Sequence, residues 1–285
     1  MNDLFERLRN RALAALDVLG DLQIAHALLV DPTPSAMRDA EFGLITLKNG
    51  RSGLYYAWLG GDQEQLPERG KALQLEDSSV AALLDFLASE SDAERSLGIA
   101  AVNAITASLY QQADYRPPRA TDAFGELSPR SGDVLGMIGN FPPLVRQAHN
   151  LGLPVHVVEK KQHMLREEDN LVISLDPNVL NPCNKIVCTG ATLINQSFQS
   201  MLEHCPPAAA IALVGPTVGC FPDDFFERGV YSLAGAAIDD GWLAHETLAA
   251  GGRLGDVSHK TTITRSNYPG FDTLISRAAD KTPAM

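Results

Sequence analysis

The chain of 285 residues contains few cysteines, and they follow no disulfide or zinc-site pattern. No C-x-x-C pair occurs among the four, which are Cys183, Cys188, Cys205 and Cys220. Scattered thiols in a chain of this length favour a reducing compartment over a disulfide framework. The histidines also lack H-x-H and H-x-x-x-H spacing, so a metal site would have to be assembled from residues distant in the sequence.

Basic residues are scarce as well, at 23 Lys plus Arg against 35 Asp plus Glu, which gives a net charge of -12. An acidic surface repels nucleic-acid phosphates and anionic lipids, and the longest basic cluster is only Lys160-Lys161. We therefore expect neither nucleic acid nor a membrane as a partner. A symmetric homodimer is the general expectation for a protein that oligomerises.

Long apolar runs are missing, because no stretch approaches the 18 residues that a membrane span requires. Residues 3–18 place apolar side chains at helical spacing among charges, which predicts an amphipathic helix rather than a signal peptide. We expect a cytoplasmic protein. No G-x-S-x-G elbow occurs, which disfavours an α/β-hydrolase.

Three short apolar runs that end in a Gly-containing turn are the most informative feature present. They are Val134–Pro143, Lys185–Thr192 and Ala210–Thr217. A run too short for a helix, followed by glycine and then helix-like sequence, is typical of a buried parallel strand. Ligands of open α/β sheets bind at the carboxyl ends of such strands, so these turns mark the expected binding face.

The order of the expected elements predicts an α/β protein. A smaller N-terminal α+β domain is followed by a Rossmann-like, mainly parallel, doubly wound sheet. Residues 1–90 form the small domain, with a helix at 3–18, strands at 23–30, 41–47 and 54–59, and a helix at 78–87. Residues 91–131 comprise a helix at 91–112 and a Pro-rich connection. The Rossmann-like domain, 132–285, has strands at 133–138, 154–158, 185–189, 209–214 and 230–235. Its expected helices are 142–150, 191–203, 222–227 and 240–250.

The first turn, Gly139-Asn140-Phe141-Pro142, offers backbone donors to an anion but lacks the G-x-G-x-x-G of a dinucleotide site. Glu159 ends the next strand, 20 residues after Gly139. An acidic residue at that spacing binds a ribose diol in nucleotide-binding sheets. The alternative interpretation is a solvated carboxylate beside Lys160 and Lys161.

The second turn holds Thr189, Gly190, Thr192 and Asn195, whose hydroxyls and amide suit a carboxylate or phosphate at a helix start. An ordinary N-cap with a satisfied Asn is the alternative. The third turn contains Gly215, Pro216 and Thr217, a rigid loop whose backbone can approach a ligand. Cys220 beside it is either a ligand or nucleophile or, more commonly, an inert packing residue.

These turns occur together with Ser96–Ile105, Val158-Glu159, Phe226–Val230, Leu233-Ala-Gly235 and Gly251-Gly252. In this order the strings resemble the putative heavy-metal chelation family over roughly residues 90–255. The resemblance implies an enolase-N-terminal-like domain, a Rossmann-like domain and a ligand cleft between them. Asn140 stands where an aromatic residue or His is often expected in the family, which weakens a metal role for this position.

Three functions fit the sequence. The first is binding of a heavy metal or a small anionic metabolite in the interdomain cleft, with Asn103 and the three turns as ligand-binding residues. The second is an enzyme acting on a small, metal-chelating metabolite, with Glu159 as the acid–base group. The third is a nucleotide-type cofactor binder that uses Glu159 on the ribose. The sequence leaves the cofactor unknown, with a transition-metal ion as one candidate, and names no metal ligand.

Overall fold

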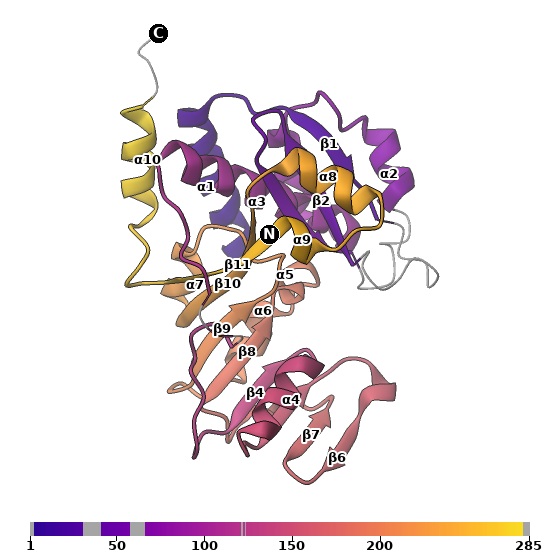
Figure 1. Cartoon of the computed structure of the whole chain (residues 1–285), viewed down its shortest axis with the longest axis vertical. Coiled ribbons are helices and arrows are strands. Elements are labelled where there is room, and N and C mark those ends of the chain that lie inside the picture. The colour runs from indigo at the N-terminus through magenta and orange to yellow at the C-terminus, as the bar shows by residue number, and fades with distance from the viewer. Residues whose placement is uncertain (1–2, 31–40, 58–65, 121, 123, 282–285) are drawn as a thin grey trace.

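The computed structural model describes residues 3–30, 41–57, 66–120, 122 and 124–281. The chain forms a three-stranded antiparallel sheet and an eight-stranded, mostly parallel sheet (Figure 1). This arrangement confirms the expected α/β class with a smaller N-terminal sheet. No helix of the described part is long and apolar enough to cross a bilayer.

The first elements largely match the predicted pattern, with the small sheet in the order β1-β2-β3. They are α1 (Asp3–Leu19), β1 (Ile24–Leu28), β2 (Phe42–Leu47), β3 (Ser52–Tyr56), α2 (Leu66–Leu73) and the 3-10 helix η3 (Val80–Ala88). The predicted strand at 54–59 begins earlier, and Trp58 and Leu59 lie outside the described residues. The predicted helix at 78–87 is a 3-10 helix, and α2 was not predicted.

Helix α3 (Asp92–Gln112) is the central element of the molecule. Its N-cap is Ser91, whose hydroxyl accepts a hydrogen bond from the amide of Glu94 at 3.2 Å. Leu97 and Ile105 are fully buried, and so is Ile99 on another side of the helix. A helix that is apolar all round is enclosed by other elements. α3 accordingly packs against α1, β3, η3, α5 and α10.

The large sheet has the strand order β11-β10-β9-β8-β4-β5-β7-β6. Its parallel strands are β4 (Leu135–Ile138), β5 (Val155–Val158), β7 (Leu171–Ser174), β8 (Lys185–Thr189), β9 (Ala210–Val214) and β10 (Val230–Ile238). The antiparallel edges are β6 (Arg166–Glu168) and β11 (Ser258–Thr264). In chain order the parallel strands lie 3-2-1-4-5-6, the Rossmann order, and the direction reverses between β4 and β8.

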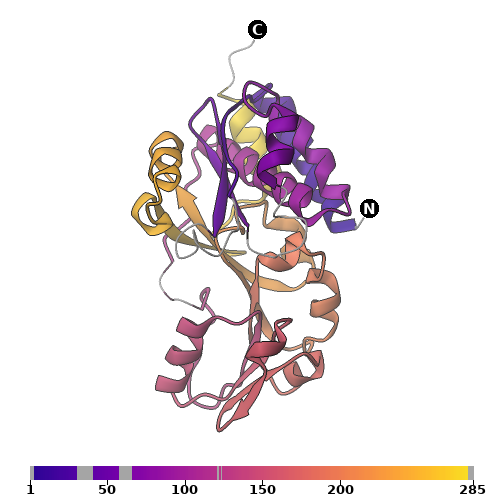
Figure 2. The ribbon, with the colours of Figure 1, turned by 90° about the vertical axis from the view of Figure 1, so that its right-hand side faces the viewer.

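Helices lie on both faces of this sheet (Figure 2). The helices after β4 are α4 (Pro142–Asn150), α5 (Ala191–Ile194), α6 (Phe198–Glu203), α7 (Asp223–Glu227), α8 (Gly241–Ala249), α9 (Leu254–Val257), α10 (Phe271–Ala279) and the 3-10 helices η4 (Gln162–Met164) and η5 (Pro177–Leu180). Of these, α8 packs on β1 and β2 of the small sheet, and α10 packs on α1 and α3. The single helix predicted at 191–203 was wrong. Gln196 has a φ of 57°, and the Asn195 side chain accepts the amide of Ser197, so the helix divides there.

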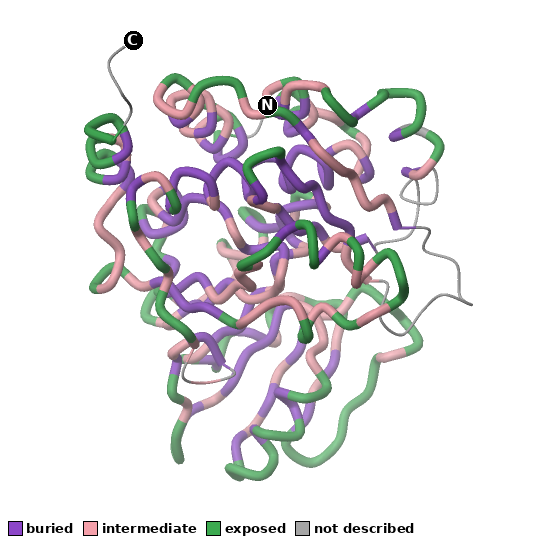
Figure 3. The backbone as a smooth tube through the Cα atoms, turned by 45° about the horizontal axis from the view of Figure 1, so that its top comes forward, coloured by how far each residue is buried: buried purple, intermediate pink, exposed green. Residues whose placement is uncertain are grey.

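The Pro-rich connection returns the chain from α3 to β4 along the edge of the large sheet. The amide of Thr262 donates to the carbonyl of Pro118, and the amide of Ala120 to that of Lys260, both at 3.0 Å. One buried apolar cluster runs from α1 through α3 to β8 and β9, and Figure 3 shows the buried segments continuing into the strands. The predicted boundaries at residues 90 and 131 stay predictions.

Candidate functional site

The three predicted turns lie side by side, because β4, β8 and β9 are neighbours in the sheet. The first amide of each turn is already bonded. The amides of Gly139, Gly190 and Gly215 donate at 2.9 Å to carbonyls of the adjoining strands, at Val158, Val214 and Ala234. These three amides therefore extend the hydrogen-bonding pattern of the sheet by one residue beyond each strand.

The polar side chains of the second turn make local contacts. The Thr189 hydroxyl accepts the amide of Ala191 at 3.3 Å, and the buried Thr192 hydroxyl donates to the carbonyl of Thr189 at 2.6 Å. Asn195 Oδ1 accepts the amide of Ser197 at 3.1 Å and its hydroxyl at 2.6 Å. These bonds stabilise the start and end of α5, and a ligand role for the three residues stays a prediction.

The first turn is joined to Glu159 at the end of β5. Glu159 Oε2 accepts the amide of Asn140 at 3.1 Å, and Oε1 accepts the amide of Lys161 at 3.0 Å. Phe141 precedes α4 and packs on the apolar cluster beneath that helix. Burial raises the pKa of Tyr56 to about 12, with further contributions from the carboxylates of Glu41 and Glu159. The end of β3 therefore lies within electrostatic range of Glu159.

Asn103 connects α3 to two other elements. Its Nδ2 donates to the carbonyl of Leu54 in β3 at 2.8 Å and to that of Thr217, after β9, at 2.7 Å. Asn103 and Thr217 are 3% and 2% exposed. Among the predicted residues, these two meet through a direct hydrogen bond, and Pro216 adjoins them in the loop.

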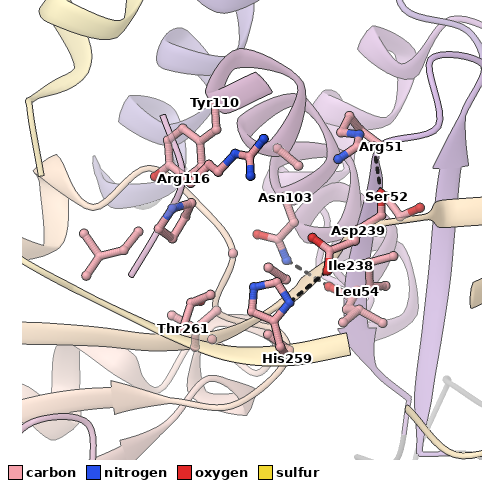
Figure 4. Close-up of a pocket in the computed structure, with 18 of the residues that line it drawn as sticks. Arg51, Ser52, Leu54, Asn103, Tyr110, Arg116, Ile238, Asp239, His259 and Thr261 are labelled. Atoms are coloured by element: carbon pink, nitrogen blue, oxygen red, sulfur yellow. Dashed lines mark hydrogen bonds and ion pairs between the residues drawn. The ribbon is translucent and has the colours of Figure 1, made fainter. Parts of the chain in front are cut away.

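A cavity of about 800 Å³ opens beside this contact, between α3 and the β10–β11 edge of the large sheet. Figure 4 shows Arg51, Asn103, Tyr110, Arg116 and His259 around it. The main lining residues are Arg51, Ser52, Leu54, Asn103, Ala107, Tyr110, Gln111, Asp114–Arg119, Pro216, Val218, Gly219, Cys220, Leu233, Gly235–Asp239, His259, Thr261 and Ile263. A volume of this size is typical of a small-molecule pocket.

Small side chains on β10 leave room for the cavity. Gly235, Ala236 and Ala237 line it in succession, where larger residues would fill the volume. A Cβ at Gly235 would lie 2.0 Å from the carbonyl oxygen of Val218, so only glycine allows the loop after β9 to pack on this strand. The floor of the cavity is thus fixed by close backbone packing.

Three guanidinium groups line the cavity, although the chain as a whole is acidic. Arg51 comes from the start of β3, and Arg116 and Arg119 come from the Pro-rich connection. Arg116 and Arg119 form no hydrogen bond or ion pair with any other residue that the structure describes.

The two lining carboxylates both have cationic or ionisable neighbours. Asp239 Oδ2 lies 3.2 Å from His259 Nδ1, and Asp114 Oδ2 lies 3.9 Å from Lys281 Nζ. The remaining guanidinium groups therefore favour an anion in the cavity.

Three buried polar atoms of the lining have no hydrogen-bond partner within the described protein: Arg51 Nε, Asn103 Oδ1 and Tyr110 Oη. Tyr110 is 7% exposed, and burial raises its pKa well above the ordinary value of 10.0, so the phenol stays protonated. Unpaired buried polar atoms are costly, and their gathering around one cavity indicates a polar occupant.

Cys220 also lines the cavity, but burial raises the pKa of its thiol to about 12. Such a thiol is protonated near neutral pH, which makes Cys220 a poor nucleophile. Nowhere in the described ranges, the cavity included, do three His, Cys, Asp or Glu side chains gather closely enough to hold a metal ion. The described side chains therefore do not fit a bare metal ion bound by protein ligands alone.

Two of the predicted site residues, Asn103 and Pro216, line the cavity. Thr217 is not in the lining, but its carbonyl accepts a hydrogen bond from Asn103. The remaining predicted residues lie along the strand ends and are absent from the lining: Gly139, Asn140, Phe141, Glu159, Thr189, Gly190, Thr192, Asn195 and Gly215. Sequence reasoning missed the three arginines. Arg116-Pro-Pro-Arg119 was the available signal, since it places two arginines in a Pro-rich segment of a chain with net charge -12.

The comparisons with known proteins agree with this fold. The model of a family described as "Putative heavy-metal chelation" (DUF364) matches residues 122–266. An uncharacterized protein of Methanocaldococcus jannaschii is 26% identical over 150 residues, which are 52% of this chain and 56% of that protein. The chain thus spans about half the length of this relative.

Two crystal structures of DUF364 proteins of unknown function share the fold. The protein from Pyrococcus horikoshii has 20% identity and a TM-score of 0.65, covering 90% of this chain and 99% of that one. The protein from Desulfitobacterium hafniense DCB-2 has 20% identity and a TM-score of 0.60, covering 92% and 99%.

Proposed function

We propose that this chain, which belongs to the family described as "Putative heavy-metal chelation", binds a small anionic metabolite in the arginine-lined cavity. The observation that carries the proposal is the convergence of Arg51, Arg116 and Arg119 on one cavity in a protein of net charge -12. Guanidinium groups bind carboxylates and phosphates through paired hydrogen bonds, which favours an anion over a neutral ligand.

The predicted binding face comprises the carboxyl ends of β4, β8 and β9, and the cavity shares only β9 with it. Pro216 follows β9 and Asp239 follows β10, so the cavity adjoins the carboxyl ends of these two strands. The opposite wall comes from α3 and β3. This placement supports a ligand held between the large sheet and the N-terminal elements.

A metal would be the cargo of this protein rather than a resident ion. A bare cation is repelled by three guanidinium groups, whereas an anionic chelate of the same metal is attracted to them. We therefore propose that a metal ion reaches the cavity as its complex with an anionic organic chelator.

Calorimetric titration with inorganic phosphate, citrate and ATP tests the proposal. At least one of these anions should bind the wild type, and Arg116→Gln should weaken it roughly tenfold by removing a charge-assisted hydrogen bond. The matched control is Arg146→Gln, an exposed arginine on α4. Absence of binding by all three anions would refute the proposal, as would equal weakening by both variants.

A nucleotide-type cofactor is the second candidate, favoured by the position of Glu159. This residue ends β5, the second parallel strand of the Rossmann order, where an acidic side chain binds a ribose diol. The acid–base role of Glu159 in an enzyme is a further hypothesis for the same carboxylate. Binding of ATP that is lost in Glu159→Gln and retained in Arg116→Gln would favour this candidate over the arginine-lined cavity.

A further inference from the structure

We infer that the cavity selects hydroxy-polycarboxylates, meaning ligands with two or more carboxylates and a hydroxyl group between them. The inference rests on the proposed anion-binding function and adds the class of ligand. It follows from two of the three unpaired atoms of the lining, the hydrogen-bond donor Nε of Arg51 and the acceptor Oδ1 of Asn103, whose residues line the cavity on neighbouring walls.

The acceptor is Oδ1 of Asn103. The contacts of the amide nitrogen Nδ2 establish which of the two side-chain atoms is the oxygen. Nδ2 donates to two carbonyl oxygens, those of Leu54 and Thr217. Rotating the amide by 180° would place an oxygen against both carbonyls, which leaves only one orientation. Oδ1 is therefore left to accept a hydrogen bond, and a ligand group with an N–H or O–H can supply it. The side chain is 97% buried, being 3% exposed.

The donor is Nε of Arg51. The guanidinium is held from its other end, because Nη2 donates to the carbonyl of Asp239 at 2.8 Å. Nε is buried without a partner, so it requires an acceptor from the ligand. A carboxylate oxygen supplies the strongest such acceptor. Arg51 and Leu54 both border the cavity from β3, so this donor lies on the wall that adjoins the Asn103 amide (Figure 4).

A second anionic group is favoured by the Pro-rich connection on another wall. Arg119 forms an antiparallel bridge with Thr261 of β11, and residues in such a bridge direct their side chains to the same side of the sheet. Both residues line the cavity, as does Arg116. Anions are thus favoured at two places, near Arg51 and near the connection.

The ligand group that donates a hydrogen bond to Asn103 Oδ1 is a hydroxyl rather than an ammonium group. Three guanidinium groups surround the cavity, and a cationic ligand group would be repelled by them. A hydroxyl donates without charge. Hydroxyl and carboxylate oxygens together also coordinate metal ions, which agrees with a chelator as the ligand.

Citrate and tricarballylate form the deciding pair of probes, because they carry the same three carboxylates and differ only in the hydroxyl. Calorimetric titration of the full chain at constant ionic strength should show tricarballylate binding roughly 5- to 100-fold more weakly than citrate. Malate and succinate repeat the comparison with two carboxylates. Arg51→Lys keeps the charge but loses the Nε–H group, and it should weaken citrate and tricarballylate to the same degree.

Asn103→Ala, if its melting curve shows a folded protein, should bring the two ligands to similar affinity, as expected when one partner of a coupled pair is removed. Equal affinity of citrate and tricarballylate for the wild type overturns the inference. In that case the anion-binding function still stands if Arg116→Gln weakens both ligands. Failure of both ligands to bind, while phosphate or ATP binds, overturns the ligand class alone. Failure of every anion removes the proposed function as well.

Discussion

The amide nitrogen Nδ2 of Asn103 lies 2.7 Å from the carbonyl oxygen of Thr217 and ties the central helix to the loop after β9. The same nitrogen also holds the carbonyl of Leu54 in the small sheet. One side chain therefore fixes two walls of the cavity relative to α3. It joins segments more than 100 residues apart in the sequence, since Asn103 and Thr217 are 114 positions apart.

Asn103→Ala should lower the free energy of unfolding by about 2–4 kcal/mol, because two buried carbonyl groups lose their donor. Urea denaturation measures this change. Gln111→Ala, an exposed position of the same helix, is the control and should change stability by less than about 0.5 kcal/mol. Equal effects of the two variants would contradict the bridging role of Asn103.

Asp224→Asn should destabilise the fold by about 3 kcal/mol. The carboxylate is fully buried and accepts Nε of Arg7 at 2.6 Å and Nε of Arg11 at 2.7 Å, which joins α1 to α7. Removing the charge leaves the guanidinium of Arg11 without this counterion, whereas Arg7 keeps its ion pair with Glu227 and is partly exposed, which reduces the cost. The comparison is Asp85→Asn, whose carboxylate is 73% exposed beside Arg9 and should contribute under about 1 kcal/mol. Chemical denaturation of both variants should separate them clearly.

Glu159→Gln should leave anion binding in the arginine-lined cavity unchanged, because Glu159 is not among the lining residues. The substitution places an NH₂ group against a backbone amide, at Asn140 or Lys161, and should cost about 1–2 kcal/mol of stability. Calorimetric titration with citrate, phosphate and ATP measures the affinity. Loss of binding of all three anions would move the functional site to the strand ends.

Acidification should destabilise the protein partly through His245. Burial, and to a lesser extent the nearby His26, lower the pKa of His245 below its ordinary value of 6.5. The unfolded chain then binds the proton more readily, so stability is complete above pH 6.5 and falls as the pH drops below that value. His156, whose pKa burial also lowers, adds to the same trend.

The urea midpoint should therefore decrease less between pH 7.5 and pH 5.5 in His245→Gln than in the wild type. His149→Gln, on the exposed end of α4, is the control and should retain the wild-type difference. An identical fall in wild type and His245→Gln would show that His245 contributes nothing to the pH dependence.

The sheet interior was predictable from particular residues. Leu135–Ile138, Lys185–Thr189 and Ala210–Val214 are apolar runs because both faces of a central parallel strand are covered. The edge strands β6 and β11 were not predicted, and neither was β7, which lies between β5 and β6. Ser258–Thr264 has no apolar run and becomes a strand by pairing with β10, and Arg166–Glu168 is polar and exposed.

The candidate site was predictable only in part. Asn103 and Pro216 were identified because they occur within recognisable strings, and both line the cavity. Arg51 carries no local signal of binding, and the Arg116-Pro-Pro-Arg119 string does not show whether its arginines face a ligand or solvent. Their common cavity arises from contacts between β3, α3 and the Pro-rich connection.

Local sequence by itself determined the Rossmann-like strands and their glycine turns, because burial and backbone geometry act over a few neighbouring residues. Only the tertiary structure decided which polar groups remain available. The first amide of each turn donates to a carbonyl of an adjoining strand. By contrast, arginines distant in the sequence line one cavity together with Asn103, whose Oδ1 has no partner among the described residues. Hydrogen-bond satisfaction depends on every element packed around a group, and no local pattern in the chain records that packing.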